Sequence, residues 1–144
     1  MTHEHPARAA AQRSMEAVHR KDKEAWVANF ADDAILEDPI GRSPLDPDGQ
    51  GHRGREAIAA FWDKQIGPNR VLFNVARSYA AGSEVANVGT ITIVMEGGLV
   101  TLVDGVFTYR VNEAGKVTAL RAFWEIDRLK LFPPASPPSA AVRS

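Results

Sequence analysis

Residues 30–41 read FADDAILEDPIG, and the rest of the chain is organised around this stretch. Ile35 and Leu36 indicate a short strand, which ends where Pro39 removes a backbone hydrogen-bond donor and holds the preceding residue extended. Asp38 is therefore expected at a stiff strand end beside apolar residues. A carboxylate partly removed from water has a raised pKa and is a better proton acceptor near neutral pH. Because acids are also common in solvated turns at such places, this stretch alone leaves both interpretations open.

The overall composition predicts a single soluble domain. A chain of 144 residues, of which 44% are hydrophobic and 24% charged, suits one domain with its own core. The net charge of −1 gives no reason to expect nucleic acid or an anionic membrane as a partner. The absence of cysteine excludes disulfides, thiolate metal sites and a cysteine nucleophile. Since no apolar run resembles a secretory signal or a membrane span, we expect a cytoplasmic protein.

Metal and phosphate chemistry find little support in the sequence. The chain has four histidines, and they lack the spacing of a metal site. No glycine-rich phosphate loop or nucleophile elbow is present. We therefore expect no metal site.

Hydrophobic spacing changes along the chain from a helical period to a strand period. Helices are expected over residues 6–20, from an Asp22 N-cap to about residue 30, and over residues 54–66 after a loop. From residue 71 onward, segments rich in Val, Ile, Thr, Phe and Tyr alternate with turn signals. The expected strands are residues 72–79, 84–95, 99–111 and 116–127.

Helices followed by strands predict an α+β fold. The N-terminal helices should pack on a strongly curved, mainly antiparallel sheet and close an apolar, cone-shaped pocket. Residues 1–131 would form this single domain, and the Pro-rich residues 132–144 are predicted to be a disordered tail. Side chains expected to point inward either bind a ligand or simply fill the core. They are Trp62 on the third helix and Val103, Phe107, Leu120 and Trp124 on the strands.

Several segments together resemble the steroid delta-isomerase (ketosteroid isomerase) family, within the nuclear-transport-factor-like and polyketide-cyclase-like superfamily. The resemblance covers about residues 8–127. The segments that carry it are Gln12-Arg13, FADDAILEDPIG at 30–41, FTYRVNEAGKV at 107–117 and Leu120-Arg121-Ala122. It implies a homodimer that binds a small apolar ligand, a steroid. It also implies that no cofactor is needed, because the carbonyl of the substrate acidifies the neighbouring carbon.

The resemblance implies that Asp38 is the general base. In the family, the Asp of the EDP motif moves a proton within a 3-oxo-delta5-steroid beside an oxyanion hole, and the double bond enters conjugation with the ketone. Two positions of this chain depart from that pattern. The place of the Tyr of the hole is Ser14, and the place of its protonated Asp is Phe107; a supporting Tyr matches Trp62. Losing one such donor usually costs about 2.7–4 kcal/mol of transition-state stabilisation.

Other side chains are candidates to replace the missing donors. Ser14 itself has a short hydroxyl, and the indole N–H of Trp62 or Trp124 is a second possibility. Tyr109 shares the face of Phe107, two residues further along the strand. Asp104 and Glu125 are expected on the outer face by strand alternation, unless a bulge at Gly105 re-aims Asp104.

Three functions are consistent with these residues. The leading hypothesis is a steroid delta-isomerase-like enzyme that uses Asp38. The alternative is a non-catalytic steroid- or lipid-binding protein of the same fold, because Ser14 and Phe107 lack the usual donor groups. A third is epoxide hydrolysis or polyketide cyclisation. Epoxide hydrolysis needs an Asp–Arg–Asp network in the pocket, whereas Arg13 and Arg121 are expected to face away from it.

Overall fold

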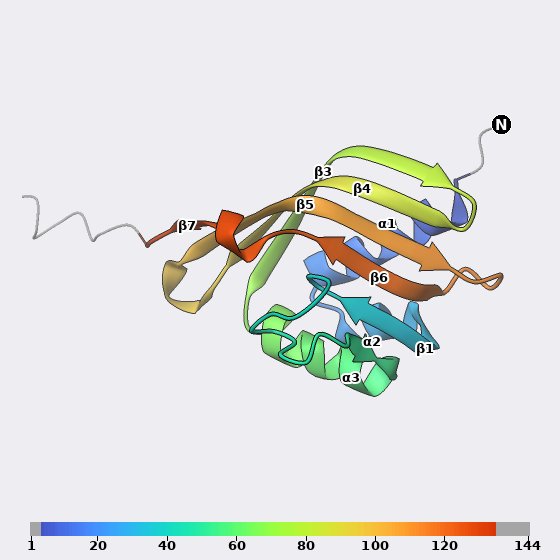
Figure 1. Cartoon of the computed structure of the whole chain (residues 1–144), viewed down its shortest axis with the longest axis horizontal. Coiled ribbons are helices and arrows are strands. Elements are labelled where there is room, and N and C mark those ends of the chain that lie inside the picture. The colour runs from blue at the N-terminus through green and yellow to red at the C-terminus, as the bar shows by residue number, and fades with distance from the viewer. Residues whose placement is uncertain (1–3, 135–144) are drawn as a thin grey trace, which may run out of the picture.

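In the computed structural model, which describes residues 4–134, the helices lie against one face of a curved sheet (Figure 1). The helical elements are α1 (Pro6–His19), α2 (Lys23–Ala28), α3 (Gly54–Phe61) with the π-helical turn η1 (Trp62–Ile66), and the short turns η2 (Glu96–Gly98) and η3 (Ile126–Arg128). The strands are β1 (Phe30–Glu37), β2 (His52–Arg53), β3 (Arg70–Ala81), β4 (Glu84–Val94), β5 (Val100–Val111), β6 (Val117–Phe123) and β7 (Lys130–Phe132). This architecture confirms the predicted α+β fold with an unclosed, curved sheet.

Local sequence accounts for the first two helices. The Asp22 side chain accepts a hydrogen bond of 3.0 Å from the backbone N–H of Ala25, so Asp22 caps α2 as predicted. Helix α1 buries a stripe of mainly small side chains, which lets its backbone approach the sheet closely. These residues are Ala7, Ala10, Ala11, Ser14, Ala17 and Val18.

The sheet is mainly antiparallel, as predicted, but it contains one parallel pair that the sequence did not indicate. The strand order is β2-β1-β6-β5-β4-β3, and β7 pairs with β5 beyond this path. Neighbouring strands from β3 to β6 are antiparallel, but β1 runs parallel to β6, with Glu37 opposite Arg121. The carboxyl ends of β1 and β6 therefore lie side by side.

Two paired glycines allow the long strands to approach one another closely. Gly89 on β4 lies opposite Gly105 on β5. A Cβ atom would lie 2.2 Å from the carbonyl oxygen of Asn74 at the first position and 2.3 Å from that of Phe123 at the second. Only glycine fits at both places, as is common where strands coil strongly.

The end of the domain differs from the predicted strand over residues 116–127. Strand β6 ends at Phe123, the chain turns through η3, and β7 then adds to the edge of β5 with Phe132 opposite Val100. Phe132, the first residue of the predicted tail, is thus part of the sheet. Residues 135–144 of that tail lie outside the described part of the chain.

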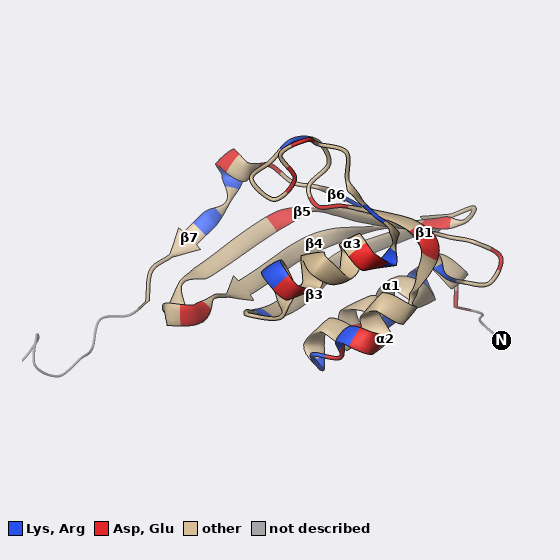
Figure 2. Ribbon diagram, turned by 90° about the horizontal axis from the view of Figure 1, so that it is seen from below, with Lys and Arg blue, Asp and Glu red and all other residues tan. Residues whose placement is uncertain are grey.

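Lys, Arg, Asp and Glu residues lie mainly on the helices and loops, and the long strands β3, β4 and β5 contain few of them (Figure 2). Within residues 4–134, no helix is long and apolar enough to cross a membrane.

Candidate active site

The helices and the concave face of the sheet enclose a cavity of about 310 Å³. This volume lies at the lower end of the range for small-molecule sites. Most of the lining is apolar, with side chains such as Val18, Trp26, Leu36, Phe61, Ile91 and Val103. The polar residues of the lining are Ser14, Asp38, Gln65, Asn69, Thr101 and Tyr109. Asp38 is the one charged residue among the described lining residues, so the cavity presents a single carboxylate to an apolar ligand.

The end of β1 sends its two acids to opposite sides. Glu37 forms an ion pair of 2.8 Å with Arg121 on the neighbouring strand β6. Asp38, the next residue, lines the cavity. Strand alternation explains the contrast, because successive side chains of an extended chain point to opposite faces.

Trp124 holds the carboxyl group of Asp38 in place. Its indole Nε1 donates a hydrogen bond of 2.5 Å to Oδ1 of Asp38. The two residues meet because each follows one strand of the parallel β1–β6 pair, and the backbone N–H of Ile40 continues the contact by donating to the carbonyl of Ala122 at 3.0 Å. Trp124 was predicted to line the pocket, but this hydrogen bond depends on the parallel pairing and was not predicted.

The surroundings of Asp38 raise the pKa of its carboxyl group. Burial is the largest cause, because the charged form loses its hydration. The hydrogen bond from Trp124 and the attraction of His52 act in the opposite direction and lower the pKa, but they do not cancel the effect of burial. Asp38 therefore accepts a proton more readily than an ordinary aspartate does.

His52 is a neighbour of the site that sequence reasoning did not single out. It lies on β2 opposite Leu36, and its ring centroid is 5.0 Å from that of Phe61. Its Nε2 atom is buried and has no hydrogen-bond partner among the described residues. His52 lies in residues 42–53, which the sequence indicates as a loop. Nothing in the composition of that segment predicts a two-residue strand beside β1.

Tyr109 is a second buried polar residue of the cavity, with 4% of its surface exposed. Burial raises the pKa of its phenol, and the negative charge of Asp38 raises it further. Neighbouring Ser14 opposes both effects by favouring the phenolate, but the pKa stays raised. Tyr109, Ser14 and Asp38 therefore form one group of interacting side chains.

The structure brings together most of the residues predicted for the site. Trp62 is the exception. It is 5% exposed and packs against Trp26, with ring centroids 5.3 Å apart, and it is Trp26 that lines the cavity. The π-helical turn η1 directs Trp62 toward Trp26 on α2, and Trp62 is not among the described residues that line the cavity. The predicted residues that do line the cavity are Ser14, Asp38, Val103, Phe107, Leu120 and Trp124.

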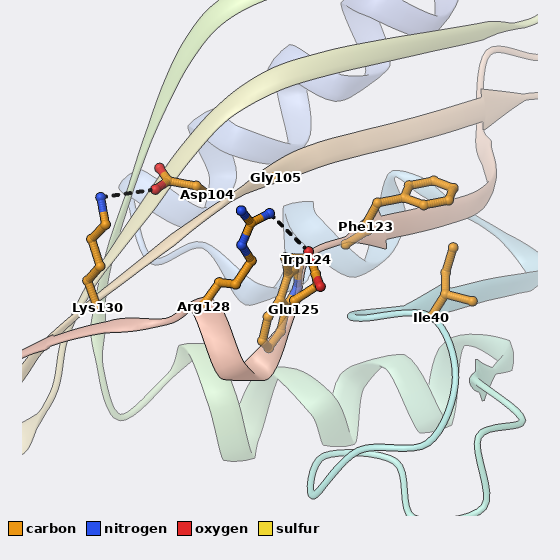
Figure 3. A pocket seen from close by; sticks show the side chains of 9 residues that line it. Ile40, Asp104, Gly105, Phe123, Trp124, Glu125, Arg128 and Lys130 are labelled. Carbon is orange, nitrogen blue, oxygen red and sulfur yellow. Dashed lines mark hydrogen bonds and ion pairs between the residues drawn. The ribbon is translucent and has the colours of Figure 1, made fainter.

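A second hollow, on the outer face of the sheet, contains the two acids considered as replacement donors (Figure 3). Asp104 accepts a hydrogen bond of 2.6 Å from Thr90 and lies 3.7 Å from the ammonium group of Lys130. Glu125 pairs with Arg128 at 3.2 Å. The pairing of β4 with β5 continues through this region without a bulge, so Asp104 stays on the outer face.

The two arginines that could serve an Asp–Arg–Asp network also lie outside the cavity. Arg13 donates hydrogen bonds to the side-chain oxygen of Asn29 and the carbonyl of Gly115. Arg121 pairs with Glu37. No arginine is among the described lining residues.

Comparisons with known proteins agree with this geometry. The chain matches the SnoaL-like domain family over residues 11–120. It therefore belongs to the SnoaL-like domain family, whose fold is the cone-shaped α+β domain described above. Its structural relatives include ketosteroid isomerase, which agrees with the resemblance seen in the sequence.

Three solved structures show how close the relationship is. Delta5-3-ketosteroid isomerase from Mycobacterium sp. is 40% identical with a TM-score of 0.87, and the match covers 90% of this chain and 100% of the isomerase. RV0760c from Mycobacterium tuberculosis, in complex with estradiol-17beta-hemisuccinate, is 40% identical with a TM-score of 0.85, covering 88% and 99%. A computationally designed 17-OHP binder is 38% identical with a TM-score of 0.87, covering 90% and 98%.

The same fold also occurs with other chemistry. An epoxide hydrolase from M. tuberculosis shares it at 19% identity and a TM-score of 0.70, with 85% of this chain and 84% of the hydrolase covered. At that identity the likeness concerns the fold alone.

Proposed function

We propose that this protein is a steroid delta-isomerase-like enzyme that acts on a 3-oxo-delta5-steroid, with Asp38 as the proton-transfer base. The observation that carries the proposal is the carboxyl group of Asp38, which lines an apolar cavity, is held by Trp124 and has a raised pKa. The 40% identity to a ketosteroid isomerase over the whole of that enzyme supports the choice of substrate class.

The reaction needs one base and no cofactor. Ionised Asp38 removes a proton from the carbon between the ketone and the double bond, and the electron pair of that C–H bond shifts toward the ketone oxygen to give a dienolate. Protonated Asp38 then returns the proton to the far carbon of the dienolate. The double bond ends in conjugation with the ketone, and Asp38 is ionised again. A raised pKa favours this shuttle because the same group must first accept and then release the proton.

Steroid turnover by variants at Asp38 tests the proposal. A 5-ene-3-oxosteroid is supplied, and the absorbance of the conjugated enone is followed. Asp38→Asn should lower the rate by about 10²–10⁴-fold, the usual contribution of a positioned base. Glu37→Gln is the matched control, because Glu37 is the neighbouring acid but pairs with Arg121 outside the cavity. Equal rates for wild type and Asp38→Asn would exclude Asp38 as the base.

A non-catalytic steroid-binding protein is the second candidate. It is favoured by Phe107, an apolar side chain where the related isomerases place a donor, and by relatives described as a 17-OHP binder and as an estradiol-hemisuccinate complex. Tight binding of a steroid ketone, without any turnover at substrate saturation, would favour the binding protein over the isomerase.

Two further proposals concern the assembly of the protein and its location in the cell. We propose a homodimer that buries the outer face of the sheet, where Phe123 is 50% exposed beside half-buried Val106. A cytoplasmic location rests on the sequence alone.

A further inference from the structure

The proposed reaction places a negative charge on the ketone oxygen, and the cavity must supply a hydrogen-bond donor to that atom. Three groups that could serve are already engaged or misplaced. The indole N–H of Trp124 donates to Asp38, and Asp104 lies on the outer face with Thr90 and Lys130. Trp62 lies behind Trp26. The position of Phe107 carries no polar group at all.

We propose that Tyr109, backed by Ser14, is the donor to the ketone oxygen. This role rests on the proposed isomerase function. The residue reaches the cavity from β5, on the same face as Val103 and Phe107. It therefore offers a phenolic O–H two residues along the strand from the side chain that lacks one.

The position of Tyr109 is tightly determined. It lies between Val85 of β4 and Leu120 of β6 in the sheet, and both neighbours are buried. Ser14 approaches it from α1. With packing on both sides and a helix above, the phenol has little freedom to leave the cavity, as a preorganised donor requires.

Hydrogen bonds fix the part of helix α1 that carries Ser14 against the end of the sheet. The guanidinium of Arg13 donates to Oδ1 of Asn29 at 3.1 Å and to the carbonyl of Gly115 at 3.0 Å. The amide of Asn29 in turn donates to the carbonyl of Ala10 at 2.9 Å. These bonds tie α1 to the β5–β6 turn and to Asn29, at Arg13 directly before Ser14 and at Ala10 one helical turn before it.

The protonation state of Tyr109 suits a donor. Its raised pKa keeps the phenol neutral through the physiological range, so a proton is available for donation. Nearby Asp38 contributes to this effect, which shows that base and donor share one small space. Ser14 acts on the phenol in the sense that favours the phenolate, and a hydroxyl acting in this way polarises the phenolic O–H toward the substrate. The bond to the substrate strengthens as charge develops on the ketone oxygen, so it accelerates the reaction.

Steady-state turnover of a 5-ene-3-oxosteroid is the first readout. Tyr109→Phe removes only the hydroxyl and should lower kcat by about 10²–10³-fold, the usual loss for one donor. Tyr79→Phe is the matched control, because Tyr79 is the other tyrosine of the chain and is 60% exposed on β3. It should leave kcat unchanged. Circular dichroism melts check that both variants fold.

Ligand binding is the second readout and does not depend on turnover. The dissociation constant of 2-naphthol, which carries one hydroxyl on a flat apolar frame, is measured in the Asp38→Asn background. Naphthalene is the oxygen-free control. Adding Tyr109→Phe should weaken binding of 2-naphthol about tenfold and leave naphthalene unchanged. Ser14→Ala should weaken 2-naphthol by a smaller factor, again without an effect on naphthalene.

The two readouts separate this inference from the proposed function. If wild type isomerises the steroid and Tyr109→Phe is equally fast, Tyr109 is not the donor, and the role of Asp38 is untouched. If wild type turns over no steroid, the proposed isomerase function is rejected. The binding of 2-naphthol then decides whether Tyr109 contacts the oxygen of a ligand. A tenfold loss that is specific to 2-naphthol then retains Tyr109 as the polar contact of a binding site, and equal dissociation constants overturn it.

Discussion

Asp38 carries a charge where the fold has removed most of its hydration. Because its pKa is raised, the folded state binds the proton of Asp38 more tightly than the unfolded chain does. The raised pKa of Asp38 therefore contributes its whole share to the free energy of unfolding below the ordinary pKa of an aspartate, about 4. This contribution is lost as the pH rises through the higher pKa of the folded state. At neutral pH the ionised carboxylate weakens the fold.

Asp38→Asn should therefore stabilise the protein while it lowers turnover. Asparagine keeps the size of the side chain but cannot ionise, so we expect a gain on the order of 1 kcal/mol, or roughly 3 °C in Tm, at pH 7. The gain should shrink toward zero as the pH falls below about 4. Thermal unfolding of both proteins between pH 3.5 and 8 measures it. A variant that is less stable than wild type at pH 7 would contradict the account of the raised pKa.

The hydrogen bond from Trp124 should influence the pH at which kcat/KM falls on the acidic side of the pH–rate profile. The proposed isomerisation requires ionised Asp38, so its rate should fall as the pH drops through the pKa of Asp38. Trp124→Phe removes a donor that stabilises the carboxylate, and the pKa should rise further. We expect the limb of kcat/KM to move to higher pH by roughly one unit.

Trp62→Phe provides the control for this shift. It changes a buried tryptophan that packs on Trp26 and does not line the cavity, so the limb should stay in place. An unmoved limb in Trp124→Phe would mean that the indole does not tune the base.

At the residue level, the sequence predicted that Asp38 and most of the other lining residues face the cavity, but not the groups that shift the pKa of Asp38. Asp38 follows from local pattern, because Pro39 and strand alternation fix its direction. The bond from Trp124 and the proximity of His52 depend on strand pairing between segments far apart in the chain, which local pattern does not contain. The sequence alone could not place Trp62, because the apolar stripe of residues 54–66 is broad. Packing against α2 decides which residues of that stripe face the cavity.

Among the elements, the paired glycines of β4 and β5 position one wall of the site. A side chain at Gly105 would clash with the carbonyl of Phe123 at 2.3 Å and approach Cβ of Trp124 to 3.0 Å. Gly105→Ala must therefore displace the backbone next to the tryptophan that holds Asp38. We expect a loss of about 1–3 kcal/mol in the free energy of unfolding, together with a fall in turnover.

Gly67→Ala is the matched control for Gly105→Ala. Gly67 has an ordinary helical φ of −55°, and its nearest neighbour, in Trp62, would lie 3.4 Å from a new Cβ atom. This variant should be as stable as wild type or slightly more stable. Urea denaturation of the two variants compares them, and equal stabilities would show that the close approach at Gly105 can relax.

The types of the main elements were predictable, whereas two of their pairings were not. Apolar periodicity and turn residues identify the helices and the four long strands. The parallel pairing of β1 with β6 and the return of β7 to the edge of β5 were missed. Strand β7 is three residues long, too short for a period to show, and it lies where proline-rich composition indicated the start of a tail.

At the scale of the whole molecule, the proposed dimer is directly measurable. Wild type should elute with twice the 15.7 kDa mass of the chain in size-exclusion chromatography with light scattering at micromolar concentration. Phe123→Asp places a charge on the outer face and should yield the monomer mass. Glu113→Lys, on the β5–β6 turn, should leave the dimer intact. A monomeric wild type at this concentration would reject the dimer.

The hydrogen bond between Trp124 and Asp38 joins residues 86 positions apart in the chain. Contacts of this kind form late, because the chain must close a long loop before they give any stabilisation. Asp38 therefore acquires its hydrogen bond from Trp124 only when β6 has docked beside β1. Recovery of activity during refolding should consequently coincide with the final gain of native structure rather than precede it. For the same reason, a fragment that ends before β6 would retain Asp38 but lack the indole that stabilises its charge.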